Sequence, residues 1–141
     1  MHPPAGKWDF KTAQPSKTLF DHYNIDKSLV PQIVDNFTIQ ANVSQVGAEA
    51  TGLKIGTPIT YRAGDQPNNA HTLGARDIGD IVATGGTSGV VYALTDQLSG
   101  KELTKVNTFA HVDYQPKHKM LGKLLNVNGA GIQYRWLQQL M

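Results

Sequence analysis

The segment Gly64-Asp65-Gln66 stands where a β-rich run, residues 57–63, gives way to a helical pattern. An aspartate at such a corner can accept a proton from a hydroxyl, because a general base needs hydrogen-bond reach first and a suitable pKa second. Gln66 can both donate hydrogen bonds to a polyol and accept them from it. The alternative is that Asp65 only caps the helix by holding the amides two or three residues on.

Residues 85–89, with the sequence GGTSG, are the second candidate. Glycines let backbone amides approach an anion closely, and the hydroxyls of Thr87 and Ser88 add donors, so such a loop can cradle a nucleotide phosphate. The alternative is a hairpin turn built from ordinary turn residues. No lysine follows the glycines, which excludes a Walker A loop.

A third glycine-rich stretch, residues 128–133 with the sequence NGAGIQ, opens a helical pattern. Glycines at this place can let a nucleotide lie against the N-terminus of a helix. The alternative is that they only allow close packing.

The histidines show no metal-ligand spacing; they stand at positions 2, 22, 71, 111 and 118. We expect packing or surface roles for His71 and His111, and no metal site of the protein's own. Glutamate occurs only as Glu49 and Glu102. A glycosidase needs two facing carboxylates, and the pair left open is Asp65 with Asp113.

Composition limits the class of protein. The 141 residues are 40% hydrophobic and 17% charged, which is typical of a globular chain. The net charge of +2 is spread along the chain, so we expect no nucleic-acid partner. No apolar run approaches the ~20 residues of a membrane helix, so we expect no membrane partner either. The absence of cysteine fits a reducing compartment, and we expect a cytoplasmic protein.

The expected elements change character near residue 75. Residues 1–15 predict an irregular arm, because they contain three prolines. Helices are predicted over 45–51, between Ser44 as N-cap and Gly52 as stop, over 65–73 and over 132–141. Strands are predicted over 57–63, 80–84, 90–95, 106–114 and 120–127. We therefore predict an α/β fold in which residues 1–75 end one domain and residues 76–141 begin another.

Taken in order, these segments resemble the FGGY carbohydrate kinases, and among them the xylulose kinases most. The matching segments are 57–66 around Gly-Asp-Gln, 79–93 around Gly-Thr-Ser-Gly-Val, 108–111 with Thr-Phe-Ala-His, and 129–137 ending in Trp-Leu. The resemblance covers about residues 16–141. The family's first phosphate loop and its adenosine motif have no counterpart here, so an internal fragment is expected.

The resemblance implies a ribonuclease-H/actin-like kinase fold with ATP and Mg²⁺ as cofactors and a sugar, such as the ketopentose D-xylulose, as substrate. It makes Asp65 the general base and Gln66 a sugar contact. It places Gly86 and Thr87 beside the ATP phosphates, and Gly129 and Gln133 near the nucleotide.

The alternative function is a non-catalytic domain that keeps the fold for sugar binding or assembly. A fragment that spans two domains should be inactive alone. It should also expose apolar faces, and these favour association, so we expect a homo-oligomer.

Overall fold

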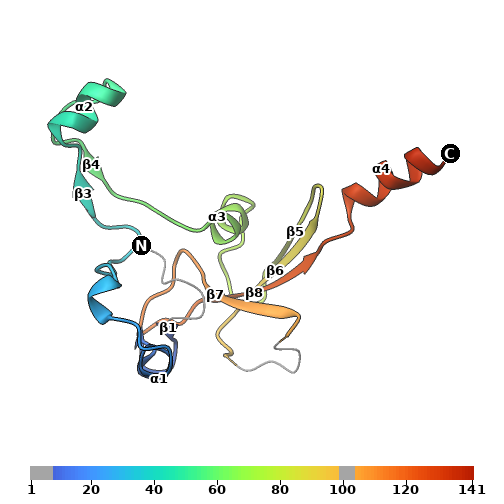
Figure 1. Ribbon diagram of the computed structural model, residues 1–141, viewed down its shortest axis with the longest axis horizontal. Helices are drawn as coiled ribbons and strands as arrows, with labels where there is room; N and C mark the ends of the chain where they lie inside the picture. The colour runs from blue at the N-terminus through green and yellow to red at the C-terminus, as the bar shows by residue number, and fades with distance from the viewer. Residues whose placement is uncertain (1–7, 99–103) are drawn as a thin grey trace.

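The computed structural model describes residues 8–98 and 104–141. Its largest unit is an antiparallel sheet of four strands in the order β5-β6-β8-β7 (Figure 1). The strands are β5 (Ile81–Gly85), β6 (Gly89–Thr95), β7 (Val106–Ala110) and β8 (Leu121–Val127). The hairpin predicted around residues 85–89 is confirmed, with Gly85 paired to Gly89.

Strand β7 is shorter than predicted, because the chain turns directly after Ala110. The amide of His111 donates to the carbonyl of Met120 at 3.0 Å, and the amide of Tyr114 donates to the carbonyl of His111 at 3.0 Å. These bonds close a turn where the sequence pattern predicted a strand continuing to Tyr114. The turn brings β8 back beside β7.

The core lies on one face of the sheet and under helix α3 (Asp65–Thr72). Its buried members come from the helix, the segment after it, β6 and the start of β8: Ala70, Ala75, Tyr92, Leu94, Met120 and Leu124. Tyr92 and Leu94 alternate with less buried neighbours along β6, as expected of a strand with one covered face. The core therefore includes residues from both sides of the boundary that we predicted after residue 75, and that boundary stays a prediction.

The remaining elements contribute no residue to this core. They are β1 (Trp8–Asp9), β2 (Gln14–Pro15), α1 (Lys17–His22), the 3₁₀ turn η1 (Lys27–Leu29), β3 (Ala41–Asn42), α2 (Gln45–Thr51) and β4 (Pro58–Ile59). Strand β1 pairs with β2 within the arm that was predicted to be irregular. Helix α2 is as predicted: the Ser44 hydroxyl accepts from the amide of Gly47, and Gly52 ends the helix with a φ of 74°.

The strand predicted over residues 57–63 is reduced to Pro58–Ile59, which pairs only with Ala41–Asn42. The last bond of this ladder runs from the amide of Gln40 to the carbonyl of Ile59. Beyond Ile59 the chain leaves its partner, so a β-rich composition alone does not extend the strand.

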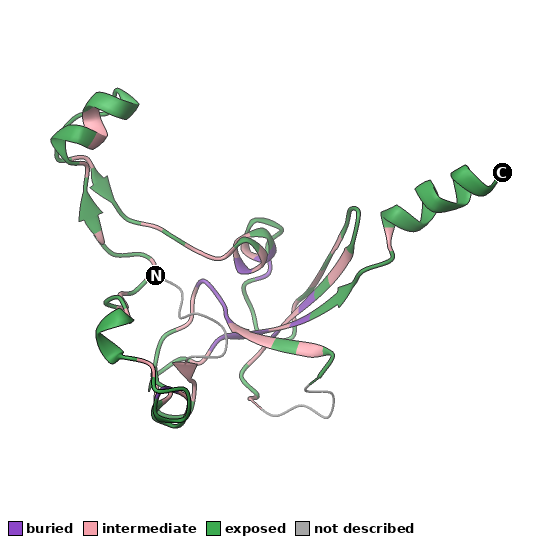
Figure 2. Ribbon diagram, in the orientation of Figure 1, coloured by how far each residue is buried: buried purple, intermediate pink, exposed green. Residues whose placement is uncertain are grey.

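Two helices contribute no buried residue to the core. Figure 2 shows α2 and the last helix, α4 (Gly131–Leu140), as largely exposed. Val46 on α2 is 75% exposed and Leu140 on α4 is 64% exposed, so the predicted exposure of apolar side chains is confirmed. No helix within residues 8–98 and 104–141 is long and apolar enough to cross a membrane.

Asp80 holds the connection between α3 and β5. Its carboxylate accepts from the amides of Arg76 at 2.9 Å and Asp77 at 3.0 Å. The hydrogen bond from Asp77, and then that from Arg76, lowers the pKa of Asp80 below its ordinary value near 3.8. A lowered carboxyl pKa stabilises the fold above that ordinary value, and the stabilisation is lost as pH falls through the folded-state pKa.

We therefore expect Asp80→Asn to lower the melting temperature at neutral pH and to have a smaller effect near pH 3. Melting followed by circular dichroism at both pH values measures this difference. Asp77→Asn is the control, because the Asp77 side chain is exposed and Asp77 contributes to the turn through its backbone amide and carbonyl. An Asp80→Asn defect of the same size at both pH values would contradict this role.

Candidate functional site

The glycine-rich hairpin is tighter than predicted. Because Gly85 pairs with Gly89, only Gly86, Thr87 and Ser88 form the loop. The amide of Gly86 donates across it to the carbonyl of Ser88 at 2.9 Å. All three loop residues are exposed, so the loop presents its backbone to solvent.

Helix α4 begins directly against this loop. The amide of Gly131 donates to the carbonyl of Gly86 at 2.9 Å, and that of Ile132 donates to the carbonyl of Thr87 at 3.1 Å. The two glycine-rich stretches, separate in the sequence, are thus joined in one structure. A β-carbon on Gly131 would overlap the carbonyl oxygen of Gly86 and would lie 3.1 Å from its carbonyl carbon. Gly131 therefore serves the close-packing role that the sequence left as an alternative.

The first amides of α4 are largely occupied by this junction. Besides Gly131 and Ile132, Gln133 donates its amide to the carbonyl of Ala130 at 3.1 Å. Beside the junction lies a groove with a volume of about 670 Å³ that a ligand could enter. The groove is lined by Gly85, Gly86, Ala130, Gly131, Gln133, Tyr134 and Leu137.

The predicted nucleotide residues fall on or next to this groove. Gly86 and Gln133 line it. Thr87 and Gly129 are chain neighbours of lining residues but do not line the groove themselves. The lining combines glycine backbone with one aromatic ring, that of Tyr134.

Asp65 is the first residue of α3, and Gly64, not Asp65, occupies the N-cap position. The Asp65 carboxylate is exposed and accepts from the amide of Gln66 at 2.8 Å. The capping alternative, in which Asp65 holds the amides two or three residues on, is therefore wrong. Gln66 is partly buried. The groove at α4 is lined by β5, the hairpin loop and the α4 region alone, so Asp65 and Gln66 lie outside it.

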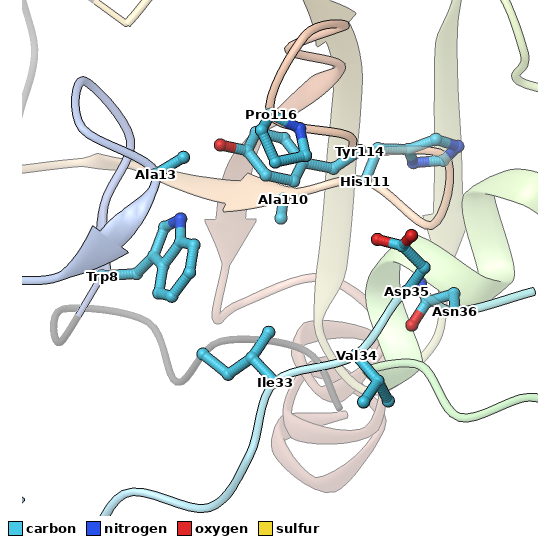
Figure 3. A pocket seen from close by; sticks show the side chains of 10 residues that line it. All are labelled: Trp8, Ala13, Ile33, Val34, Asp35, Asn36, Ala110, His111, Tyr114 and Pro116. Atoms are coloured by element: carbon cyan, nitrogen blue, oxygen red, sulfur yellow. The ribbon is translucent and has the colours of Figure 1, made fainter. Parts of the chain in front are cut away.

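A second hollow, of about 180 Å³, was not indicated by any sequence motif. Figure 3 shows the side chains that line it, which come from the N-terminal arm, the segment 33–36, the end of β7 and the turn after β7. Trp8 forms one wall, and Asp35 and His111 lie on the opposite side (Figure 3). Because these segments are far apart in the sequence, no local spacing could have predicted the hollow.

A cluster of two histidines and an aspartate shares His111 with this hollow. The Nδ1 atom of His71 is 3.5 Å from Oδ2 of Asp113, and Nε2 of His111 is 3.8 Å from the same oxygen. His111 is fully buried, which excludes the surface role that the sequence left open for it. Burial, and after it the negative charge of Asp113, raises the pKa of Tyr61 at the edge of this cluster.

The fold is that of a segment of the sugar kinases. The chain superposes on xylulose kinase from Rhodospirillum rubrum with a TM-score of 0.81 at 21% identity, over 96% of this chain and 26% of that one. Ligand-bound xylulose kinase from Lactobacillus acidophilus gives a TM-score of 0.82 at 22% identity, over 95% and 26%. Gluconate kinase from Lactobacillus acidophilus gives 0.81 at 21% identity, over 93% and 26%.

These likenesses establish the fold, and the chain spans about a quarter of the length of these kinases. No protein-family model matches the sequence. No curated protein matches it either.

The junction of α4 with the hairpin loop predicts the effect of a small substitution. Gly131→Ala should push the start of α4 away from Gly86, because the carbonyl is backbone and cannot turn aside. In the Gly131→Ala variant we expect faster hydrogen exchange, measured by NMR, at the backbone amides of residue 131 and of Ile132. Gly129→Ala is the matched control, since a β-carbon there meets nothing within 4 Å. Unchanged exchange in Gly131→Ala would show that the junction is looser than described.

Proposed function

We propose that the chain is part of an ATP-dependent sugar kinase that phosphorylates a ketopentose such as D-xylulose. One observation carries the proposal: a glycine hairpin, bound through its carbonyls to the start of a helix, borders an open groove within a sugar-kinase fold. In a ribonuclease-H/actin-like kinase fold, residues 76–141 would begin the nucleotide-binding domain and residues 1–75 would end the sugar-binding one.

Asp65 would act as the general base. Its carboxylate would take the proton from the sugar hydroxyl as that oxygen attacks the γ-phosphorus of ATP, and ADP would leave. Gln66, partly buried beside it, would hold the sugar through its side-chain amide. The exposed position of Asp65 at the start of α3 leaves its carboxylate accessible to a substrate.

The residues that line the groove at α4 are better suited to contact ATP than to ligate Mg²⁺. Gly86 and Gln133 would contact ATP, with Thr87 and Gly129 at their sides. When bound, Mg²⁺ neutralises the phosphate charge. None of the described residues that line the groove carries a carboxylate, so the ion would be held mainly through the phosphates.

The exposed apolar side chains of α4 would be covered in the complete enzyme, which we propose to be cytoplasmic and homo-oligomeric. Residues 1–141 alone would then transfer no phosphate, because they would supply only part of each binding site.

The test is a coupled assay for ADP release by the complete enzyme with D-xylulose, ribulose or gluconate, together with calorimetry of sugar binding. ADP release that requires one of these sugars supports the kinase. Sugar binding without ADP release would favour the alternative, a sugar-binding or assembly domain that keeps the fold.

A further inference from the structure

The cluster of His71, His111 and Asp113 brings together three side chains from two elements. His71 lies on α3, and the other two lie in the turn that follows β7. Each offers one ligand atom, and the three atoms lie within 4.8 Å of one another. The rings of His71 and His111 have centroids 6.0 Å apart at an interplanar angle of 48°, so the two imidazoles are tilted and not stacked.

The separations agree with the edges of a coordination tetrahedron. Zinc takes imidazole nitrogen and carboxylate oxygen at about 2.0–2.2 Å, which places neighbouring ligand atoms roughly 3.4 Å apart. The distances of 3.5 Å and 3.8 Å to Oδ2 of Asp113 exceed this by about 0.1 and 0.4 Å, and the histidine ligand atoms lie within 4.8 Å of each other. Small side-chain rotations would therefore bring all three atoms onto one ion.

The surroundings hold the ligands in place. The turn that carries His111 and Asp113 is fixed by the backbone bond from His111 to Met120 and by the bond from the side-chain amide of Asn36 to the carbonyl of Val112 at 2.8 Å. His71 is held by its helix, and its Nδ1 atom is buried and makes no hydrogen bond within residues 8–98 and 104–141. A rigid site spends little free energy on ordering its ligands.

The cluster is also open enough for an ion to enter. The side chains of His71 and Asp113 are 27% and 35% exposed, whereas that of His111 is fully buried. A tetrahedral ion with three protein ligands keeps a fourth position for water.

We propose that His71, His111 and Asp113 form a binding site for a divalent transition-metal ion, with Zn²⁺ as the best-suited ion. Two imidazoles and one carboxylate favour zinc and its neighbours over Mg²⁺, which prefers oxygen ligands in an octahedron. The site is separate from the groove at α4 and does not depend on the proposed kinase activity. Its bound ion would tie α3 to the turn after β7, and so stabilise the helix that begins at Asp65.

The test is a calorimetric titration of the full chain with Zn²⁺, carried out with and without Mg²⁺ as the competing ion. We expect one Zn²⁺ per chain, little competition from Mg²⁺, and a higher melting temperature with Zn²⁺, since a ligand that binds the folded state stabilises it. His71→Gln and Asp113→Asn should each weaken Zn²⁺ binding by at least about tenfold, the smaller loss known for disturbing even an outer-shell partner.

His22→Gln is the matched control, because His22 is an exposed histidine outside the cluster. It should bind Zn²⁺ as the unaltered chain does. Thermal melting without metal shows whether each variant folds. If His71→Gln does not fold, Asp113→Asn still tests the site, because asparagine has the same size as aspartate. Co²⁺ gives a second measurement: strong visible absorption of a four-coordinate ion is expected in the unaltered chain and should be lost in Asp113→Asn. Absence of Zn²⁺ binding, or equal affinity in folded Asp113→Asn and unaltered chains, would overturn the site.

Discussion

Asp65→Asn is expected to lower the kcat of the complete kinase about a thousandfold, within the range by which a general base accelerates a reaction. An asparagine keeps the size of the side chain but cannot accept the hydroxyl proton. The KM for ATP should change little, because Asp65 lies outside the groove at α4.

The structure indicates that Asp65→Asn removes the carboxylate with little effect on the stability of the fold. Gly64 holds the N-cap position, so the start of α3 does not depend on an Asp65 cap. The carbonyl oxygen of an asparagine can still accept the bond from the amide of Gln66. Loss of a negative charge in the first turn should cost only about 0.5 kcal/mol of stability.

Steady-state kinetics of the complete enzyme, paired with thermal melting, measures both effects. Asp77→Asn removes another exposed aspartate near the same helix and should leave kcat unchanged. If Asp65→Asn retained full turnover, Asp65 would not be the base and the kinase proposal would lose its catalytic residue. An unfolded Asp65→Asn variant would instead point to a structural role.

Gly122→Ala is expected to cause the largest loss of stability. Gly122 lies in β8, opposite Leu94 of β6 and Phe109 of β7. A β-carbon there would overlap Cζ and the hydroxyl oxygen of Tyr92 and would lie 2.5 Å from Cε1. Tyr92 is 2% exposed, so its ring covers the glycine within the core and has no free space to enter.

Overpacking a core costs about 1–3 kcal/mol, and more where a whole ring must move. We expect Gly122→Ala to lose about 3 kcal/mol of unfolding free energy, a large part of the total for a small domain. Urea denaturation measures this loss.

Gly85→Ala is the control in a strand of the same sheet, because a β-carbon there meets nothing within 4 Å. Combining Gly122→Ala with Tyr92→Leu should recover part of the loss, since leucine has no atoms where the tyrosine ring contacts the glycine. Equal stability of Gly122→Ala and the unaltered chain would mean that the ring does not lie where the structure places it.

Features that depend on a few neighbouring residues could be predicted from the sequence. Helix α2 follows from a serine that accepts an amide bond and a glycine that tolerates a positive φ, both local properties. The GGTSG hairpin and the helices at residues 65–72 and 131–140 were predicted to within a few residues for the same reason.

Features that depend on partners far along the chain could not be predicted. Strand β7 ends at Ala110 because His111 bonds to Met120, and β4 ends at Ile59 because its partner strand leaves it. Composition does not record where a partner ends, so both strands were predicted too long.

The candidate sites divide in the same way. The glycine segments and Asp65 carry local signals, and the sequence alone marked them as candidates. Only the tertiary structure decided that Gly131 packs against Gly86, and that His71, 40 or more residues from its partners, meets His111 and Asp113. Metal ligands need proximity in space, and here the sheet core under α3 creates that proximity, not spacing along the chain.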